Sequence, residues 1–524
     1  MNLLLAVLLA AAAPEAGDVV VVCPPAFQAA LRPWSEHRAA QGHRVEVISN
    51  AGTAEEITAQ IRARPRRPQY VLLVGDAEPR MADDAGLRAR CVPTHYVKAK
   101  VNVRWGSEPE IATDAPYGDL DGDGRPDAAV GRLPADSPEE LDRMIAKTLA
   151  YERSSDHGLW RRQVNCVAGI GGFGMLADAV LESSARYLLT HNVPAAYRVS
   201  MTYGSWRSPY CPDPRQFRAA TLDRLNEGAW FWVYIGHGQP YSLDRARMPD
   251  GDYPIFTLAD AAQLRSRHAG PIALFLACYT GAFDAPHDCL GEEMLRQPGG
   301  PVAVLAGSRV TMPYAMAVFS VGLMDEVFQR RAATLGLAAL RAKQRLRQAT
   351  AKGDAQRAAL DALAAALSPA PDQLAEERAE HVLLFNLLGD PLLRLRHPQP
   401  LPLEVPTAGA AAARLKITGV APFAGVATVE LIVPRGRLTF TPPPRPAYPN
   451  DADGRAALQE VYQKANDPRW AVAVQRVGAG PFTAELDVPA AAVGNCQVCA
   501  FLEGAGDFAL GAAEVKIEPV RPAE

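Results

Sequence analysis

Two short stretches decide the fold, and each joins an apolar run to a reactive side chain. Residues 230–238 read WFWVYIGHG, and residues 272–281 read IALFLACYTG. Continuous apolar runs of this length are typical of strands buried on both faces of a parallel sheet. The first run leads into His237 and the second into Cys278. If the two strands are neighbours, the imidazole and the thiol meet at the edge of the sheet where both strands end.

The surrounding sequence alternates between strand-like and helix-like segments. Further strands are expected at residues 18–23, 45–48, 70–74, 163–170 and 302–306, and helices at 54–63, 176–190 and within 336–367. This alternation predicts βαβ units, and therefore an α/β fold with a parallel sheet flanked by helices.

The residue composition and the hydrophobic pattern change after Arg396, where a Pro-rich linker begins. Beyond it, short alternating segments at 414–417, 426–433, 482–488 and 497–502 predict a C-terminal β-sandwich of the Ig-like kind. We therefore expect four parts: a signal peptide at 1–16, an N-terminal α/β subdomain at 17–150, a catalytic α/β subdomain at 151–398, and the sandwich at 399–524.

Composition excludes several classes of protein. The 524 residues include 54 Lys+Arg and 58 Asp+Glu, which gives a net charge of −4, and 48% of them are hydrophobic. This composition is that of a folded protein, and the balance of charge argues against a nucleic-acid partner or an anionic membrane surface. Eight cysteines are too few for a disulfide scaffold.

The N-terminus predicts export. Residues 3–13 read LLLAVLLAAAA, which is the length of a signal-peptide core and too short to span a bilayer. A disordered N-terminus, or one that forms a helix in the core, is the alternative interpretation. No later segment approaches the length of a membrane span, so we expect a protein that is secreted, periplasmic or at the cell surface.

The Cys–His pair has a chemical meaning that neither residue has alone. A thiol beside an imidazole is the minimum for covalent acyl transfer, because the imidazole takes the thiol proton and later protonates the leaving amine. The main-chain N–H groups of Gly238 and Cys278 are the expected donors to an oxyanion. Taken separately, a cysteine after a strand is usually a buried thiol, and a histidine usually a satisfied polar residue.

At the level of families, the chain resembles the gingipain-type (C25) cysteine peptidases, which have a caspase-like fold. The resemblance covers roughly residues 18–396 and includes the blocks TDAPYGDLDGDGRPDAAVGRLP, LGEEMLRQPGGPVAVLAGSR and FNLLGDPLLRL, besides the two blocks quoted first. It implies that Cys278 is the nucleophile and His237 the catalytic histidine. It also matches Asp178 to the aspartate that lines the S1 pocket of Arg-specific members, although a first-turn carboxylate favoured by the helix dipole is the alternative. We find no glutamate that matches the third catalytic residue of some members.

A loop at residues 119–127 reads DLDGDGRPD and resembles a calcium loop. Asp119, Asp121, Asp123 and Asp127 occupy positions 1, 3, 5 and 9, and a glycine stands at position 6. Val130 stands where an EF-hand has its bidentate glutamate, so an Asp/Gly-rich turn is the alternative. Calcium here would be structural, and no cofactor is expected for the chemistry itself.

These observations predict an exported cysteine endopeptidase that acts on protein or peptide substrates, with a preference for basic P1 residues if Asp178 lines the pocket. The alternative is a catalytically silent relative that serves as a surface-binding or secretion-associated module. The oligomeric state is left open.

Overall fold

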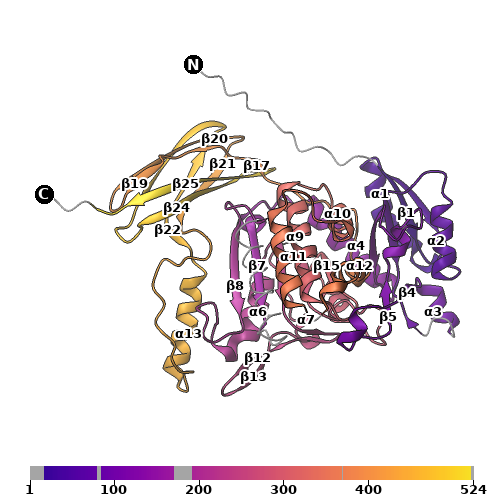
Figure 1. Cartoon of the computed structure of the whole chain (residues 1–524). Coiled ribbons are helices and arrows are strands. Elements are labelled where there is room, and N and C mark those ends of the chain that lie inside the picture. The colour runs from indigo at the N-terminus through magenta and orange to yellow at the C-terminus, as the bar shows by residue number, and fades with distance from the viewer. Residues whose placement is uncertain (1–16, 80–83, 170–191, 269, 369, 521–524) are drawn as a thin grey trace.

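A computed structural model describes residues 17–79, 84–169, 192–268, 270–368 and 370–520. Its centre is a ten-stranded sheet to which both halves of the chain up to residue 388 contribute (Figure 1). The strands lie in the order β2 (Arg44–Ile48), β1 (Asp18–Val22), β3 (Tyr70–Val74), β6 (Ala129–Leu133), β16 (Phe385–Leu388), β15 (Ala303–Gly307), β14 (Ile272–Leu276), β9 (Phe231–Ile235), β7 (Gln163–Ala168) and β8 (Arg198–Tyr203).

The sheet is parallel within each half and changes direction once. Strand β16 pairs parallel with β6 but antiparallel with β15. The carboxyl ends of β7, β8, β9, β14 and β15 therefore share one edge of the sheet. The carboxyl ends of β1, β2, β3, β6 and β16 lie at the opposite edge. The sheet is thus mixed, and chemistry at the two edges is spatially separate.

Helices cover both faces of the sheet. One face carries α1 (Gln28–Ala40), α4 (Pro138–Arg153), α6 (Phe217–Asn226), α7 (Leu258–Ala261) and α8 (Leu290–Arg296), whose apolar side chains share one core cluster. The other face carries α2 (Ala54–Arg62), α9 (Pro313–Met324), α10 (Leu335–Arg347), α11 (Ala355–Leu367) and α12 (Leu374–Leu384). A short helix, α3 (Ala85–Arg90), and a hairpin of β4 (His95–Lys98) and β5 (Glu110–Thr113) flank the N-terminal half.

The strands that carry His237 and Cys278 lie at the centre of this core. Every residue of β9 and β14 is buried. Trp232 and Phe275 pack edge to face with ring centroids 5.4 Å apart, an arrangement that adds to the stability gained by burying each ring. Because both strands are covered by helices on both faces, their ends are held rigidly at the edge of the sheet.

The C-terminal part is a two-sheet sandwich, and the predicted fold class is confirmed. One sheet contains β17 (Gln399–Pro400), β25 (Phe508–Glu518), β24 (Gly494–Glu503), β21 (Gly425–Ile432) and β22 (Arg469–Val477), and β19 (Ala408–Ala410) pairs with β25. The other contains β18 (Leu403–Glu404), β20 (Arg414–Ala421) and β23 (Gly480–Asp487). The apolar side chains between them form a core of their own.

One element of this domain was not predicted: an arm at residues 434–468 that contains α13 (Ala452–Ala465). The arm runs from the sandwich along the outer strand β8 (Figure 1). The side-chain amide of Asn466 accepts the N–H of Met201 at 2.7 Å and donates to the Met201 carbonyl at 2.9 Å. The amide thus replaces a neighbouring strand at this position of the sheet edge.

None of the helices in the described part of the chain is both long enough and apolar enough to cross a bilayer. The predicted helix at 176–190 and the predicted signal peptide lie outside the described residues.

Candidate active site

The two predicted strand ends are neighbours. Strands β9 and β14 pair parallel, with Ile235 opposite Leu276. The Gly236 N–H donates to the Leu276 carbonyl at 3.2 Å, one step beyond the paired residues. His237 and Cys278 therefore follow adjacent strands at the same edge of the sheet.

Gly238 brings the histidine segment into contact with the cysteine segment. A Cβ atom at position 238 would lie 2.5 Å from the Cys278 carbonyl oxygen and 2.7 Å from Cγ2 of Thr280. Both distances are shorter than van der Waals contact, so only glycine fits. Substituting Gly238 would push the two segments apart.

Two hydrogen bonds fix the main chain of His237. Its carbonyl accepts the hydroxyl of Tyr234 at 2.8 Å and the N–H of Asp244 at 3.2 Å. The side chain is half-buried. These bonds hold the turn between β9 and the hairpin of β10 (Gly238–Gln239) and β11 (Ser242–Leu243).

The thiol of Cys278 is held by one residue that follows the next strand, β15. The Thr311 N–H donates to Sγ at 3.3 Å, and the Thr311 hydroxyl lies 3.6 Å from Sγ. The thiol in turn donates to the Thr311 carbonyl at 3.7 Å. Burial raises the pKa of Cys278, and the contacts with Thr311 lower it in part. Burial thus favours the neutral thiol over the thiolate at this position.

The residue after Cys278 adopts an unusual backbone conformation. Tyr279 has φ +57°, in the left-handed region that side chains other than glycine rarely adopt. Its hydroxyl donates to Glu108 at 3.0 Å, and its N–H donates to the Arg309 carbonyl at 3.2 Å. Arg309 is itself fixed by two parallel hydrogen bonds to Asp284, at 2.7 and 2.6 Å. Contacts from both halves of the chain thus impose this conformation.

The main-chain N–H of Cys278 is a further donor beside the thiol. Among the described residues, no carbonyl accepts the main-chain N–H of Cys278. An oxygen that develops negative charge beside Sγ could accept it.

Sequence reasoning missed Thr311, Tyr279 and Glu108 as parts of this site. A signal for Thr311 was present, because the predicted strand at 302–306 is followed by GSRVTMP, a third strand end beside the other two. No local signal links Glu108 to Tyr279, because the contact joins distant segments. Asp178, the predicted S1 residue, lies outside the described residues.

The Asp-rich loop brings three of its four predicted ligands together. Oxygens of Asp119, Asp121 and Asp127 lie within 4.8 Å of one another, while Asp123 is not part of this group. The Asp119 carboxylate already accepts the N–H groups of Gly122 at 2.8 Å and Gly124 at 3.1 Å. Asp123 accepts the N–H of Arg125 at 2.7 Å. These are the bonds of a turn that its own carboxylates stabilise.

A second acidic cluster, which we call the buried triad, was not predicted. It consists of Asp76, Asp288 and Glu292, whose oxygens also lie within 4.8 Å of one another. Burial raises the pKa of Asp76 and, well above its ordinary value, that of Glu292. Oxygen Oε1 of Glu292 is buried and has no hydrogen-bond donor among the described residues. The guanidinium of Arg296 bonds to Asp288. Arg296 therefore supplies one positive charge beside three carboxyl groups.

Asp76 and Asp288 also line a cavity of about 530 Å³. A cation could therefore reach the buried triad from solvent. Asp76 follows β3, whose carboxyl end lies at the edge of the sheet opposite to Cys278. A cation there would act on the fold and not on the reacting bond.

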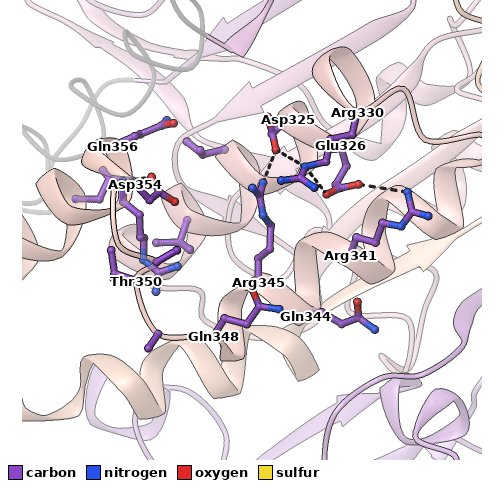
Figure 2. A pocket seen from close by; sticks show the side chains of 17 residues that line it. Asp325, Glu326, Arg330, Arg341, Gln344, Arg345, Gln348, Thr350, Asp354 and Gln356 are labelled. Atoms are coloured by element: carbon purple, nitrogen blue, oxygen red, sulfur yellow. Dashed lines mark hydrogen bonds and ion pairs between the residues drawn. The ribbon is translucent and has the colours of Figure 1, made fainter. Parts of the chain in front are cut away.

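The cavity drawn in Figure 2 is a different feature, of about 570 Å³, between α9, α10 and α11. Its charged side chains pair with one another. Asp325 accepts from Arg330 at 3.0 Å and from Arg345 at 2.6 Å, and Arg341 lies 3.5 Å from Glu326. Neither His237 nor Cys278 lines this cavity.

Comparison with known proteins identifies the family. The profile of peptidase family C25 matches residues 12–396. Gingipain R2 of Porphyromonas gingivalis (strain ATCC BAA-308 / W83) is 25% identical over 329 residues, which are 60% of this chain and 39% of the relative. Lys-gingipain HG66 of the same species is 24% identical over 291 residues, or 53% of this chain and 15% of the relative. The chain thus spans well under half the length of these relatives.

Solved structures agree on the fold. The crystal structure of the Arg specific cysteine proteinase gingipain R (RGPB) superposes with a TM-score of 0.52 at 17% identity and covers 96% of this chain and 98% of that chain. A complex of Porphyromonas gingivalis RgpB pro- and mature domains gives the same TM-score and identity, over 96% and 100% of the two chains.

The protein is therefore of the class in which a caspase-like α/β sheet presents a cysteine and a histidine at adjacent strand ends. Within this class, the chain belongs to peptidase family C25, a family of cysteine peptidases.

Proposed function

We propose that this protein is a secreted cysteine endopeptidase in which Cys278 is the nucleophile and His237 the general acid and base. The observation that carries the proposal is the pairing of β9 with β14, which puts both residues at one strand edge with Gly238 packed on the Cys278 carbonyl. Membership of a peptidase family supports it.

The chemistry follows from the geometry in four steps. His237 takes the Sγ proton as the sulfur attacks the scissile carbonyl carbon, and the carbonyl oxygen becomes an oxyanion. The N–H groups of Cys278 and Gly238 donate to this oxygen, and each such donor is worth roughly 10²–10³ in kcat. The intermediate collapses, the C–N bond breaks, and the leaving amine takes the proton from His237. Water then attacks the thioester with His237 as base, and the acid and the free thiol are released.

The raised pKa of Cys278 gives His237 an essential part in this scheme. A neutral thiol is a poor nucleophile, so proton removal has to accompany attack. The Thr311 N–H at 3.3 Å would stabilise the negative charge that then develops on sulfur.

Cys278→Ala tests the assignment. We expect hydrolysis of peptides to disappear while thermal unfolding changes little, because a half-buried thiol is replaced by a methyl group. Cys289→Ala, which removes a fully buried thiol on α8's N-terminal side, is the matched control and should keep its activity. Hydrolysis retained by Cys278→Ala would refute the assignment. Absence of hydrolysis in the unaltered protein would favour the alternative, a silent surface-binding or secretion-associated module.

We further propose a preference for basic P1 residues, with Asp178 at the base of the S1 pocket. The support is the resemblance of the segment around Asp178 and the solved relative titled Arg specific. A desolvated carboxylate would receive an arginine by two parallel hydrogen bonds, which a lysine cannot form. Asp178→Asn should therefore lower kcat/KM after Arg by about a hundredfold or more, and hardly change cleavage after Ala. Equal losses on both substrates would assign Asp178 to the fold.

A structural calcium ion is the last part of the proposal. The Asp119 loop and the buried triad are both candidates for it. The unpartnered, buried oxygen of Glu292 favours the buried triad, whereas the loop carboxylates already have main-chain donors. Export through residues 1–16 is proposed from the sequence alone, and secretion of a reporter fused to these residues would test it.

A further inference from the structure

The N-terminus of α9 lies next to the thiol and is held from outside by α12. The Met312 N–H, which precedes the first residue of α9, donates to Nε2 of His381 at 3.0 Å. The Ala315 N–H donates to Oε1 of Glu377 at 3.0 Å. Two side chains of α12, one turn apart, thus accept from main-chain groups that begin α9 and have no partner within the helix.

His381 is fixed in one state. Its Nδ1 lies 2.8 Å from the Glu377 carbonyl, so Nδ1 carries the proton and Nε2 is the acceptor. The side chain is fully buried, and burial lowers the pKa of His381 to about 4. No charged side chain among the described residues contributes to this shift. The ring is therefore a neutral acceptor near pH 7.

The peptide that His381 holds is joined directly to the one that contacts the nucleophile. The Thr311 N–H donates to Cys278 Sγ at 3.3 Å, and the next N–H along the chain, that of Met312, donates to His381. The Thr311 carbonyl belongs to the same trans peptide unit as the Met312 N–H, points the opposite way, and accepts the thiol at 3.7 Å. The bond to His381 therefore fixes the peptide that follows the Thr311 N–H, and with it the distance of that N–H from Sγ.

We propose that His381 is a positioning residue for Cys278: by accepting the Met312 N–H, it fixes the backbone of residues 311–312 and so keeps the Thr311 N–H beside the sulfur, where this donor stabilises negative charge as it develops. The inference rests on the proposed role of Cys278 as nucleophile. His381 itself touches neither substrate nor the reacting atoms.

Two substitutions of His381 distinguish the loss of the hydrogen-bond acceptor from a change in packing. His381→Gln supplies an amide oxygen near the position of Nε2, while His381→Phe keeps a flat ring of similar volume and supplies no acceptor. The readout is the rate of alkylation by iodoacetamide as a function of pH, with the modified residue identified by mass spectrometry. It requires no substrate, and Cys278→Ala gives the background from the other thiols.

We expect His381→Phe to shift the alkylation profile of Cys278 upward by about one pH unit, which is about a tenfold lower rate at pH 7. His381→Gln should stay within about threefold of the unaltered protein. In peptide hydrolysis, His381→Phe should lower kcat while KM stays nearly constant, since the bond supports charge development and not binding.

His237, the proposed base, follows the adjacent strand and is unchanged in every one of these variants. Tyr279 and Tyr234 are further titratable groups, and their pKa values respond to Cys278. Both pKa values are raised above 10, mainly by burial, so neither tyrosine titrates near pH 7. On α12, Glu377 faces the start of α9 and Glu380 accepts N–H groups of residues 101 and 102. Glu377→Gln keeps the acceptor for Ala315 and serves as the control that alters charge without altering the bond.

Equal profiles for the Phe and Gln variants would overturn the proposal, as would a Phe variant that melts at a lower temperature but alkylates normally. If the Phe variant does not fold, His381→Asn takes its place, because its shorter amide does not reach Met312. A shifted profile in a protein that hydrolyses no peptide would retain the positioning role and reject the proposed peptidase activity instead.

Discussion

The Asp119 loop and the buried triad are both groups of three carboxylates within 4.8 Å, yet their surroundings are opposite. In the loop, Asp121 and Asp127 are exposed, and main-chain N–H groups from the same turn satisfy Asp119. In the buried triad, Glu292 is 1% exposed and one of its oxygens has no donor among the described residues. The loop resembles a metal site in the sequence, whereas in the triad a buried carboxyl oxygen lacks a donor among the described residues, so a bound cation would stabilise the fold more there.

Calcium separates the two groups most strongly. We expect 1 mM calcium, compared with chelator, to raise the melting temperature by about 5 °C, which corresponds to about 2.7 kcal/mol at a concentration of 100 Kd. Glu292→Gln should abolish this rise because the variant lacks one of three anionic ligands. Asp121→Asn should leave it intact. A rise that disappears in Asp121→Asn and survives in Glu292→Gln would assign the calcium to the loop.

The second expectation concerns pH in the presence of chelator. The folded pKa of Glu292 is raised above its unfolded value of about 4.3, so its contribution to stability is complete below that pH and is lost as the pH rises through the folded pKa. Glu292→Gln, which stays neutral, should therefore be more stable than the unaltered protein at pH 8 by about 1–2 kcal/mol, and no more stable at pH 4. Thermal melts across this range give the difference directly. The matched control is Glu293→Gln, one position along α8, and a similar gain there would reduce the effect to one of net charge.

A smaller effect is expected from Asp119→Ala. Its carboxylate accepts two main-chain N–H groups and lies 3.4 Å from Arg62. The substitution should therefore cost about 1 kcal/mol of unfolding free energy, equally with calcium and with chelator. Urea unfolding measures this, and Asp119→Asn, which keeps an acceptor oxygen, should recover part of the loss. A cost that appears only with calcium would restore the loop as the metal site.

The smallest effect belongs to Asp123→Ala. This side chain is 48% exposed, accepts the N–H of Arg125 within its own turn, and lies 3.7 Å from Nε of the same exposed arginine. Its removal should change the unfolding free energy by less than about 0.5 kcal/mol, with or without calcium. The same urea titrations decide it, and a larger change in calcium alone would mean that all four predicted ligands converge when the ion binds.

The contrast between these regions shows what the sequence could predict. Both strand-end residues were predictable because each follows a continuous apolar run, and a shared edge follows from parallel pairing. The Asp-rich loop was conspicuous because all its residues are contiguous. Asp76 and Glu292 are 216 positions apart, and nothing local in either segment indicates that they meet.

Other features could not be predicted from the sequence for the same physical reason. The reversal of strand direction between β15 and β16 depends on where the chain returns after α12, and the four residues of β16 carry no mark of direction. The contact of Thr311 with Cys278 depends on strand order. The arm was not predicted because it lies between segments that alternate like strands, although Asp451 caps the start of α13.

The amide of Asn466 has a consequence for how the molecule avoids self-association. Strand β8 is an edge strand of the ten-stranded sheet. An uncovered edge strand is a template to which strands of other molecules can add. Asn466 occupies both main-chain groups of Met201, and Tyr462 bonds to Thr202 at 2.8 Å. The arm thus covers part of this edge strand, and we expect it to hinder the addition of strands from other molecules. A fragment that ends at residue 398 should form sheet-rich aggregates that bind thioflavin, while the full chain stays dispersed.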